Sequence, residues 1–219
     1  MYRRFVELLD VSSETTILDV GVTSDETMPS SNYLEAWHPY SSCITALGLA
    51  DASFLASEYP GVKFVQGNGL AMPFSDGSFD VTHCSAVIEH VGDFRNQMRL
   101  VAECARVARC GFFVTTPYRW FPIEVHTSLP VLHWFPKPWH RIILSYLGYS
   151  YYSTEDNLNL MDRNDFTRIA AALDGFAVET HMVKLYGFPS NMLLVGRRRS
   201  TDRAGTVVRE ETQGVEERS

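Results

Sequence analysis

Hydrophobic positions in the first 115 residues alternate between short continuous runs and helically spaced sets, which predicts an α/β protein. The expected strands are 17–20, 44–49, 62–66, 81–85 and 111–115. The expected helices are 2–9, 50–58 and 93–107, the last with Asp93 as its N-cap. The segment 28–40 fits neither pattern clearly, but Pro29 is a candidate start of a helix there and Pro39 would end it. Repeated alternation of strand and helix is typical of a doubly wound, Rossmann-like parallel sheet.

The segment 116–152 breaks this alternation because prolines and aromatic residues crowd it. We expect it to form an insertion that covers the functional site, and we call it the lid. Helical spacing returns over 162–173, and two further strands are expected over 176–184 and 191–197. Since no helical pattern separates these strands, they should form an antiparallel hairpin at one edge of the sheet.

Composition and charge limit the classes of function. The 219 residues carry a formal net charge of -7, which argues against a general nucleic-acid-binding surface. The four cysteines match no zinc or C-x-x-C spacing, and neither a secretory signal nor an apolar run of membrane-spanning length is recognised. A cytoplasmic protein with reduced thiols is therefore expected. Residues 198–219 are charged and poor in large apolar side chains, which predicts a disordered tail after a single domain, 1–197.

An acidic residue interrupts the first expected strand. Asp19 lies between Leu18 and Val20, where burial of a carboxylate is costly without a partner. A carboxylate at the carboxyl end of a central parallel strand can accept hydrogen bonds from loop amides and order that loop around a ligand. Gly21 would let the backbone approach the ligand closely. A solvated Asp19 on a surface strand is the alternative.

Four motifs follow one another in a recognisable order. The chain carries ILDVG at 17–21, LAMPF at 70–74 with GSFD at 77–80, AVIEHV at 86–91, and TTPYRWFPIEVHT at 115–127. Together they resemble the class I S-adenosylmethionine-dependent methyltransferases, in particular the ubiquinone and menaquinone biosynthesis group, and the last run is similar to a bacterial subgroup of that family. The resemblance implies a mostly parallel seven-stranded sheet with an antiparallel edge hairpin, and S-adenosylmethionine as cofactor.

The resemblance also implies which residues contact the cofactor. Asp19 and Gly21 match the motif around its amino-acid part, 68–70 match the loop that contacts adenine, and Ser85 matches a segment that lines the site. The implied cofactor-binding set is Asp19, Gly21, Val22, Thr23, Gly48, Leu49, Asn68, Gly69, Leu70 and Ser85.

The sequence departs from the family pattern at three points. Residues 22–25 read VTSD where a glycine-rich loop is common, Gly48 stands where an acid commonly binds the ribose, and Asn68 stands where Asp often binds the adenine amino group. Asn68 can still accept from that group through its carbonyl oxygen, and Asp51 is a candidate to reach the ribose. A non-catalytic relative that uses the fold as a binding or scaffold module would also explain these departures.

His90, Glu124 and His126 are the candidate catalytic residues. His90 follows the fourth strand, where an imidazole can act as a base. The alternative is a structural role for His90, packed in the turn and bonded to a backbone carbonyl. Glu124 and His126 follow the fifth strand and can form a base with its orienting carboxylate. His133 and His140 extend a seven-residue spacing that suggests a metal, but intervening prolines prevent a continuous helix, so no metal is expected.

The acceptor is expected to contact the lid. Residues 129–152 combine aromatic side chains with Lys137 and Arg141, as in surfaces that meet a membrane or hold a lipid-linked or aromatic molecule. A lid simply packed on the domain is the plainer alternative. The expected activity is O-methylation of a small molecule or a lipid-linked saccharide precursor. A nicotinamide-dependent oxidoreductase is the weaker alternative, because residues 21–26 do not supply G-x-G-x-x-G.

Overall fold

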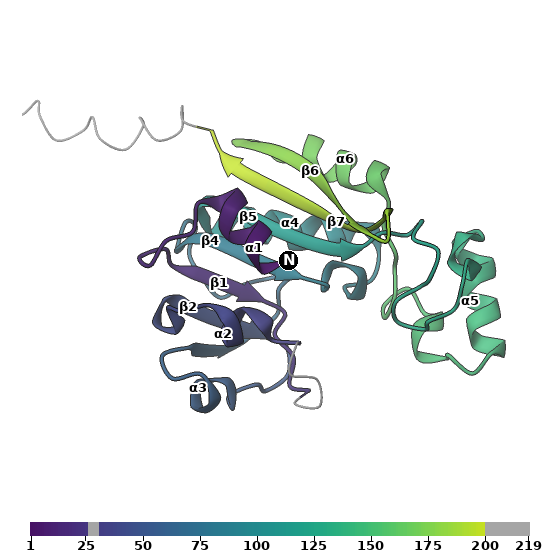
Figure 1. The fold of residues 1–219 in the computed structure, drawn as a ribbon, viewed down its shortest axis with the longest axis horizontal. Coiled ribbons are helices and arrows are strands. Elements are labelled where there is room, and N and C mark those ends of the chain that lie inside the picture. The colour runs from purple at the N-terminus through teal and green to yellow at the C-terminus, as the bar shows by residue number, and fades with distance from the viewer. Residues whose placement is uncertain (26–30, 200–219) are drawn as a thin grey trace, which may run out of the picture.

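The computed structural model describes residues 1–25 and 31–199, and its centre is a seven-stranded sheet (Figure 1). The strands are β1 (Ile17–Val20), β2 (Ile44–Gly48), β3 (Lys63–Gln66), β4 (Phe79–Ser85), β5 (Ala108–Pro117), β6 (Phe176–Leu185) and β7 (Phe188–Arg198). Every strand expected from the sequence is present, and β4, β5 and β7 are longer than expected.

The order of the strands is β3-β2-β1-β4-β5-β7-β6. Strands β1 to β5 are parallel to their neighbours, whereas β7 is antiparallel to both β5 and β6. The β6–β7 hairpin turns through Tyr186 and Gly187, which both have positive φ, as tight two-residue turns require. The predicted Rossmann-like sheet with an antiparallel edge hairpin is therefore confirmed.

Helices cover both faces of the sheet. The helices of the described residues are α1 (Tyr2–Leu9), α2 (Tyr33–Trp37), α3 (Leu55–Glu58), α4 (Phe94–Val107), α5 (Lys137–Tyr146) and α6 (Arg163–Ala171), with short 3₁₀ turns at Ser41–Cys43, Ile88–His90, Leu132–Trp134 and Tyr151–Ser153. Phe5 of α1 and Leu34 of α2 belong to one core layer. Leu100 of α4 and Phe166 of α6 belong to the other. Burial from both sides explains why Ile17, Leu18 and Val20 of β1 are all apolar.

Helix α4 begins where the sequence predicts. Asp93 Oδ1 accepts a hydrogen bond from Asn96 N at 2.9 Å, which satisfies an N–H group of the first turn. Leu100 and Val101 then pack fully buried against the sheet. This packing fixes the turn that links β4 to α4, where part of the candidate site lies.

Two helical expectations need correction. The helix expected over 50–58 is reduced to α3, because Asp51 Oδ1 accepts from Ser53 N at 2.9 Å and a local turn of this kind competes with helix. In the segment around 28–40 only α2 forms, and it ends at Trp37, before Pro39. Pro29, its expected start, lies outside the described residues.

The lid is more regular than its prolines suggested. Helix α5 has Pro136 as its N-cap and Pro138 in its first turn, where proline loses no hydrogen bond. Figure 1 shows this part of the chain as a lobe beyond the arrowheads of β4 and β5. Lys137 Nζ joins the lobe to the main body by donating to Asn159 Oδ1 at 2.6 Å.

Three further properties concern the tail, the helices and the cysteines. The expected tail, 198–219, lies outside the described residues from 200 onward. None of the described helices has the length and apolarity needed to cross a membrane. All four cysteines are free thiols.

Candidate active site

The residues predicted to contact the cofactor lie at the carboxyl ends of β1 to β4 and in the turns that follow them. Because these strands are parallel, with Val20 opposite Leu47 and Gly48 opposite Gln66, their ends share one edge of the sheet, the carboxyl edge. The strand order reverses between β1 and β4, which is where open α/β sheets bind ligands. The fold thus gathers the predicted set in one place.

The turn after β1 depends on Gly21. The backbone N–H groups of Gly21 and Val22 both donate to Leu47 O, at 2.8 and 3.2 Å. Gly21 has φ +91°, and a Cβ there would lie 2.3 Å from Cγ2 of Val87. Only glycine fits this turn, because both the backbone conformation and the approach of Val87 exclude a side chain.

An asparagine orders the loop that lacks the glycine-rich pattern. Thr23 N donates to Asn32 Oδ1 at 3.0 Å, and Asn32 Nδ2 donates back to Thr23 O at 3.0 Å. These two bonds tie the end of β1 to the start of α2. Sequence reasoning missed Asn32, whose only signal was its position before a short helical segment.

Asp19 is held by a buried imidazole. His83 Nδ1 donates to Asp19 Oδ1 at 2.6 Å, and His83 Nε2 lies 2.7 Å from the hydroxyl of Tyr33. Among the described residues, the hydrogen-bond partner of Asp19 is His83 of β4 and not a loop amide. The solvated alternative does not apply because Asp19 is buried. His83 and Tyr33 were not predicted, since the register that sets His83 opposite Asp19 is not visible in the sequence.

Glu35 places a second carboxyl beside Asp19. Its side chain is buried, and within residues 1–25 and 31–199 no N–H or hydroxyl donates to either of its oxygens. Burial, followed by the negative charge of Asp19, raises the pKa of Glu35 to about 9. Glu35 is therefore protonated at neutral pH.

The turn after β3 is shaped by Asn68. Its Oδ1 accepts from Leu70 N at 2.8 Å, and Gly67 N donates to Gly48 O at 2.9 Å. The predicted adenine contact of Asn68 must share an oxygen that already holds this turn. A carbonyl oxygen has two lone pairs, so it can accept from both groups.

The end of β2 offers an apolar contact for the cofactor. Leu49 is 74% exposed there, next to Gly48 and opposite the turn that Asn68 shapes. Asp51 lies nearby with an exposed carboxylate, although Ser53 already donates to it. An exposed leucine beside hydrogen-bonding groups fits an adenosyl group, because a ring would cover the leucine and the polar groups would orient it.

Glu124 is pinned in the loop after β5. Its Oε1 accepts from the N and the Nδ1 of His126 at 3.0 and 2.6 Å, and its Oε2 accepts from the N and the Oγ1 of Thr127, both at 2.7 Å. Burial opposes the charge, but these hydrogen bonds outweigh it and lower the pKa of Glu124 to about 2. The carboxylate is ionised and orients the imidazole of His126, as predicted.

The two candidate histidines lie side by side. The ring centroids of His90 and His126 are 4.8 Å apart and nearly perpendicular. His90 Nδ1 donates to Asn157 O at 2.6 Å. Burial lowers the pKa of His126, but the hydrogen bond and charge of Glu124 outweigh burial, so this pKa is raised overall. The sequence could not place the rings relative to one another.

Glu89 is a third member of this cluster that sequence reasoning missed. Its side chain is fully buried, and its Oε2 accepts from Thr116 Oγ1 at 2.9 Å. Burial raises the pKa of Glu89, and the nearby His90 partly offsets this. The available signal was an acid within the otherwise apolar start of the AVIEHV motif.

The cluster and the cofactor residues share the carboxyl edge. Ser85, the last residue of β4, shares a hydrogen bond of 2.9 Å between its Oγ and Thr115 Oγ1 of β5. Glu89 and His90 follow it by four and five residues, and Thr116 continues β5 toward Glu89. The histidines therefore lie next to the segment predicted to line the cofactor.

The seven-residue histidine spacing does not gather three rings. His133 and His140 lie together, with ring centroids 6.3 Å apart, but His126 contacts His90 and Tyr152 instead. His133 Nε2 donates to Phe121 O at 2.7 Å, and burial lowers the pKa of His140 to about 4. These two histidines therefore serve the packing of the lid.

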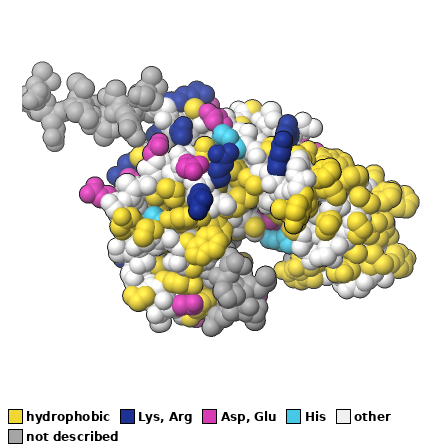
Figure 2. All heavy atoms as spheres, viewed as in Figure 1, with side chains coloured by type: hydrophobic (Ala, Val, Ile, Leu, Met, Phe, Trp, Pro, Cys, Tyr) yellow, Lys and Arg dark blue, Asp and Glu magenta, His cyan; other side chains and the backbone are white. Residues whose placement is uncertain are grey.

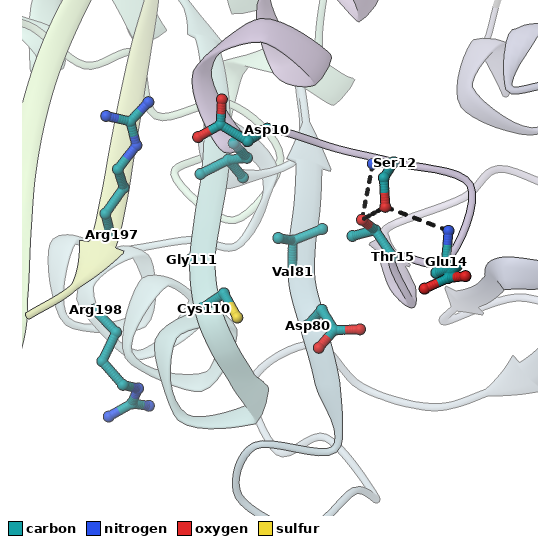
Figure 3. Close-up of a pocket in the computed structure, with 11 residues that line it drawn as sticks. Asp10, Ser12, Glu14, Thr15, Asp80, Val81, Cys110, Gly111, Arg197 and Arg198 are labelled. Carbon is teal, nitrogen blue, oxygen red and sulfur yellow. Dashed lines mark hydrogen bonds between the residues drawn. The ribbon is translucent and has the colours of Figure 1, made fainter. Parts of the chain in front are cut away.

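A separate hollow lies at the opposite edge of the sheet. Its volume is about 570 Å³, and Figure 3 shows Asp10, Asp80 and Arg197 among its lining residues, around the start of β4 and β5. None of the predicted site residues lines it. The amino ends of parallel strands carry no expected ligand site in this fold class.

The lid exposes large apolar side chains. Trp134, Phe135 and Trp139 are 42, 51 and 64% exposed, and Figure 2 shows a lobe covered largely by hydrophobic atoms. Histidine atoms are visible in the notch between this lobe and the main body. Lys137 and Arg141 are engaged with Asn159 and Glu155, the latter at 3.1 Å. The lid therefore leaves several of its aromatic side chains exposed.

Comparison with known proteins agrees with this geometry. Residues 18–115 match a family model described as a methyltransferase domain. A probable S-adenosylmethionine-dependent methyltransferase of Mycolicibacterium smegmatis is 40% identical over 72 residues, which are 32% of this chain and 27% of the relative. A demethylmenaquinone methyltransferase of Corynebacterium efficiens is 29% identical over 109 residues, which are 50% of this chain and 44% of the relative. The matches thus span less than half the length of either relative.

The fold has solved counterparts. The crystal structure of an S-adenosylmethionine-dependent methyltransferase from Methanosarcina mazei superposes with a TM-score of 0.59 and 14% sequence identity, over 90% of this chain and 98% of the other. At this identity the likeness shows the fold alone. Residues 18–115 thus match a methyltransferase domain, and the chain shares the fold of a solved S-adenosylmethionine-dependent methyltransferase.

Proposed function

We propose that the protein transfers a methyl group from S-adenosylmethionine to a hydroxyl of an acceptor with an apolar or lipid-linked part. The observation that carries this proposal is the Glu124–His126–His90 cluster beside Ser85, at the carboxyl edge of a methyltransferase fold. A hydroxyl acceptor must lose its proton when the oxygen is methylated, and an imidazole oriented by a carboxylate is suited to take up that proton.

The carboxyl edge would hold the cofactor. When bound, S-adenosylmethionine supplies a methyl group activated by a sulfonium. Gly21 keeps the turn after β1 close to the sheet, Leu49 offers an apolar contact, and the Asn68 turn presents polar groups. The chain mainly positions the reactants and excludes water, which supplies most of the rate in reactions of this kind.

His126 is the group suited to receive the hydroxyl proton. Its Nδ1 donates to the ionised Glu124, so its Nε2 carries the free lone pair of the neutral ring. Glu124 also stabilises the ring after it takes up the proton, as the carboxylate of a catalytic triad does. His90 lies against the same face of the site.

The lid would recruit the acceptor. Exposed Trp134, Phe135 and Trp139 form an apolar surface on the lobe beside the notch, and the neighbouring cations are already paired. Such a surface favours apolar contact over attraction to anionic groups, which supports a lipid-linked or aromatic acceptor and peripheral contact with a membrane through 129–152.

Calorimetric titration with S-adenosylmethionine tests the proposed cofactor site. Leu49→Asn should weaken binding about five- to tenfold, because it removes an apolar contact worth roughly 1 kcal/mol. Leu185→Asn, at an exposed leucine of the β6–β7 hairpin, is the matched control and should bind as the unmodified chain does. No binding by the unmodified, folded chain would favour the scaffold alternative.

A further inference from the structure

Among the described residues, one group of three side chains has the composition and spacing of a metal site. Glu89, His90 and His126 each offer one ligand atom, and these atoms lie within 4.8 Å of one another. A cation with bonds of about 2.0–2.2 Å holds its ligand atoms about 3–4 Å apart. The group would therefore need to contract by only about 1 Å.

Both imidazoles donate a hydrogen bond from Nδ1, as the imidazoles of metal-binding histidines commonly do from the nitrogen that does not bind the metal. His90 Nδ1 donates to the carbonyl of Asn157, and His126 Nδ1 donates to the carboxylate of Glu124, each at 2.6 Å. Each bond fixes the tautomer and leaves Nε2 free as a ligand atom. This outer arrangement of carbonyl or carboxylate, imidazole and metal recurs in metalloproteins.

The carboxylate of the group has an oxygen without a partner. Glu89 is fully buried, its Oε2 is bonded to Thr116, and no donor from the described part of the chain reaches its Oε1. A buried oxygen in this state is costly unless a donor or a cation satisfies it. The loop amides and hydroxyls around Glu124 do not serve it, because they are bonded to Glu124.

We propose that Glu89, His90 and His126 bind a divalent first-row transition-metal cation through one carboxylate oxygen and two Nε2 atoms. Two imidazoles favour such a cation over Mg²⁺ or Ca²⁺, which prefer oxygen ligands throughout. Three protein ligands leave coordination positions open, as in catalytic rather than structural sites. His90 and His126 are only partly buried, which leaves the site accessible to a cation.

The role of the cation, though not its binding, rests on the proposed function. An acceptor hydroxyl bound at an open position loses its proton to water more readily, because the cation stabilises the resulting oxygen anion. The oxygen then uses its electron pair to form the bond to the methyl carbon, and the electron pair of the broken carbon–sulfur bond stays on sulfur. With the cation in place, His126 is a ligand and no longer the base. The acceptor hydroxyl then loses its proton to water while bound to the cation, instead of passing it to the ring of His126.

Titration of the metal-free chain with Zn²⁺ by calorimetry, and with Co²⁺ by visible absorption, tests the site directly. We expect one ion per chain and cobalt bands that report nitrogen and oxygen ligands. Glu89→Gln and His126→Asn should each weaken metal binding at least tenfold. Glu124→Gln should weaken it about ten- to a hundredfold, because it removes the carboxylate that orients the His126 ligand. His181→Gln, on β6, is the matched control.

Two outcomes would overturn the proposal. One is the absence of stoichiometric binding to the unmodified chain, and the other is equal binding by the His126→Asn and unmodified proteins when circular dichroism shows both folded. His126 is only partly buried, so this variant remains informative even if the buried Glu89→Gln fails to fold. The readout is independent of S-adenosylmethionine, so failure of the metal site and failure of the proposed function are distinguished by the two titrations.

Discussion

Replacement of Glu35 by glutamine should stabilise the protein at neutral pH. The carboxyl of Glu35 is buried beside Asp19, and its pKa of about 9 lies well above the ordinary value of 4.5. A group whose pKa is raised on folding contributes stability that is fully present below its unfolded pKa and is lost as the pH rises toward its folded pKa. The unmodified chain therefore loses stability from about pH 4.5 up to about pH 9.

The size of the effect follows from the width of this window. Within it, stability falls by about 1.4 kcal/mol for each pH unit, so the loss between pH 5 and pH 7 is about 3 kcal/mol. The Glu35→Gln substitution keeps the shape of the side chain and removes its titration. The difference in the free energy of unfolding, variant minus unmodified chain, should thus rise by about 3 kcal/mol from pH 5 to pH 7.

Urea denaturation at the two pH values measures this difference. Glu14→Gln, at an exposed position, controls for the loss of one acidic group and should leave the difference unchanged. A difference for Glu35→Gln that stays constant between pH 5 and pH 7 would refute the reasoning, because it would mean that Glu35 does not hold a proton through this range.

Two further predictions concern the turn after β1 and the lid. Gly21→Ala should destabilise the chain by about 2–4 kcal/mol, because it combines an unfavourable φ with a clash against Val87. Urea denaturation measures this loss. A loss of less than about 0.5 kcal/mol would contradict the packing described. Trp139→Ser should reduce co-sedimentation with phosphatidylcholine vesicles, whereas Trp37→Ser, 59% exposed on α2, should not. Equal retention by both variants would count against membrane contact through the lid.

The strands were predictable because their chemistry is local. The strands of the parallel core are short segments bounded by turn residues, most of them rich in apolar side chains, and Asp93 marks the start of α4. The length of helix α3 was overestimated, because the hydrogen bond between Ser53 N and the Asp51 side chain sets its start. The spacing of apolar residues does not reveal such a bond. Helix α5 was missed because proline was taken as a helix breaker without regard to its position in the first turn.

The site was predictable only in part, for a different reason. Glu124 and His126 are two residues apart, so their pairing could be inferred from the sequence. The contact of Asp19 with His83 spans two strands, and that of His90 with His126 joins two loops. Contacts of this kind depend on strand register and on the path of the lid, which no local pattern encodes.

A crystal structure of the chain with S-adenosylhomocysteine would test the central claim most directly. The account predicts the ligand at the carboxyl edge, with its adenosyl part against Leu49 and the Asn68 turn, and with the Glu124–His126 pair facing its sulfur. Ligand density in the hollow of about 570 Å³ at the amino ends of β4 and β5 would contradict the account, as would a folded chain that takes up no ligand at saturating concentration.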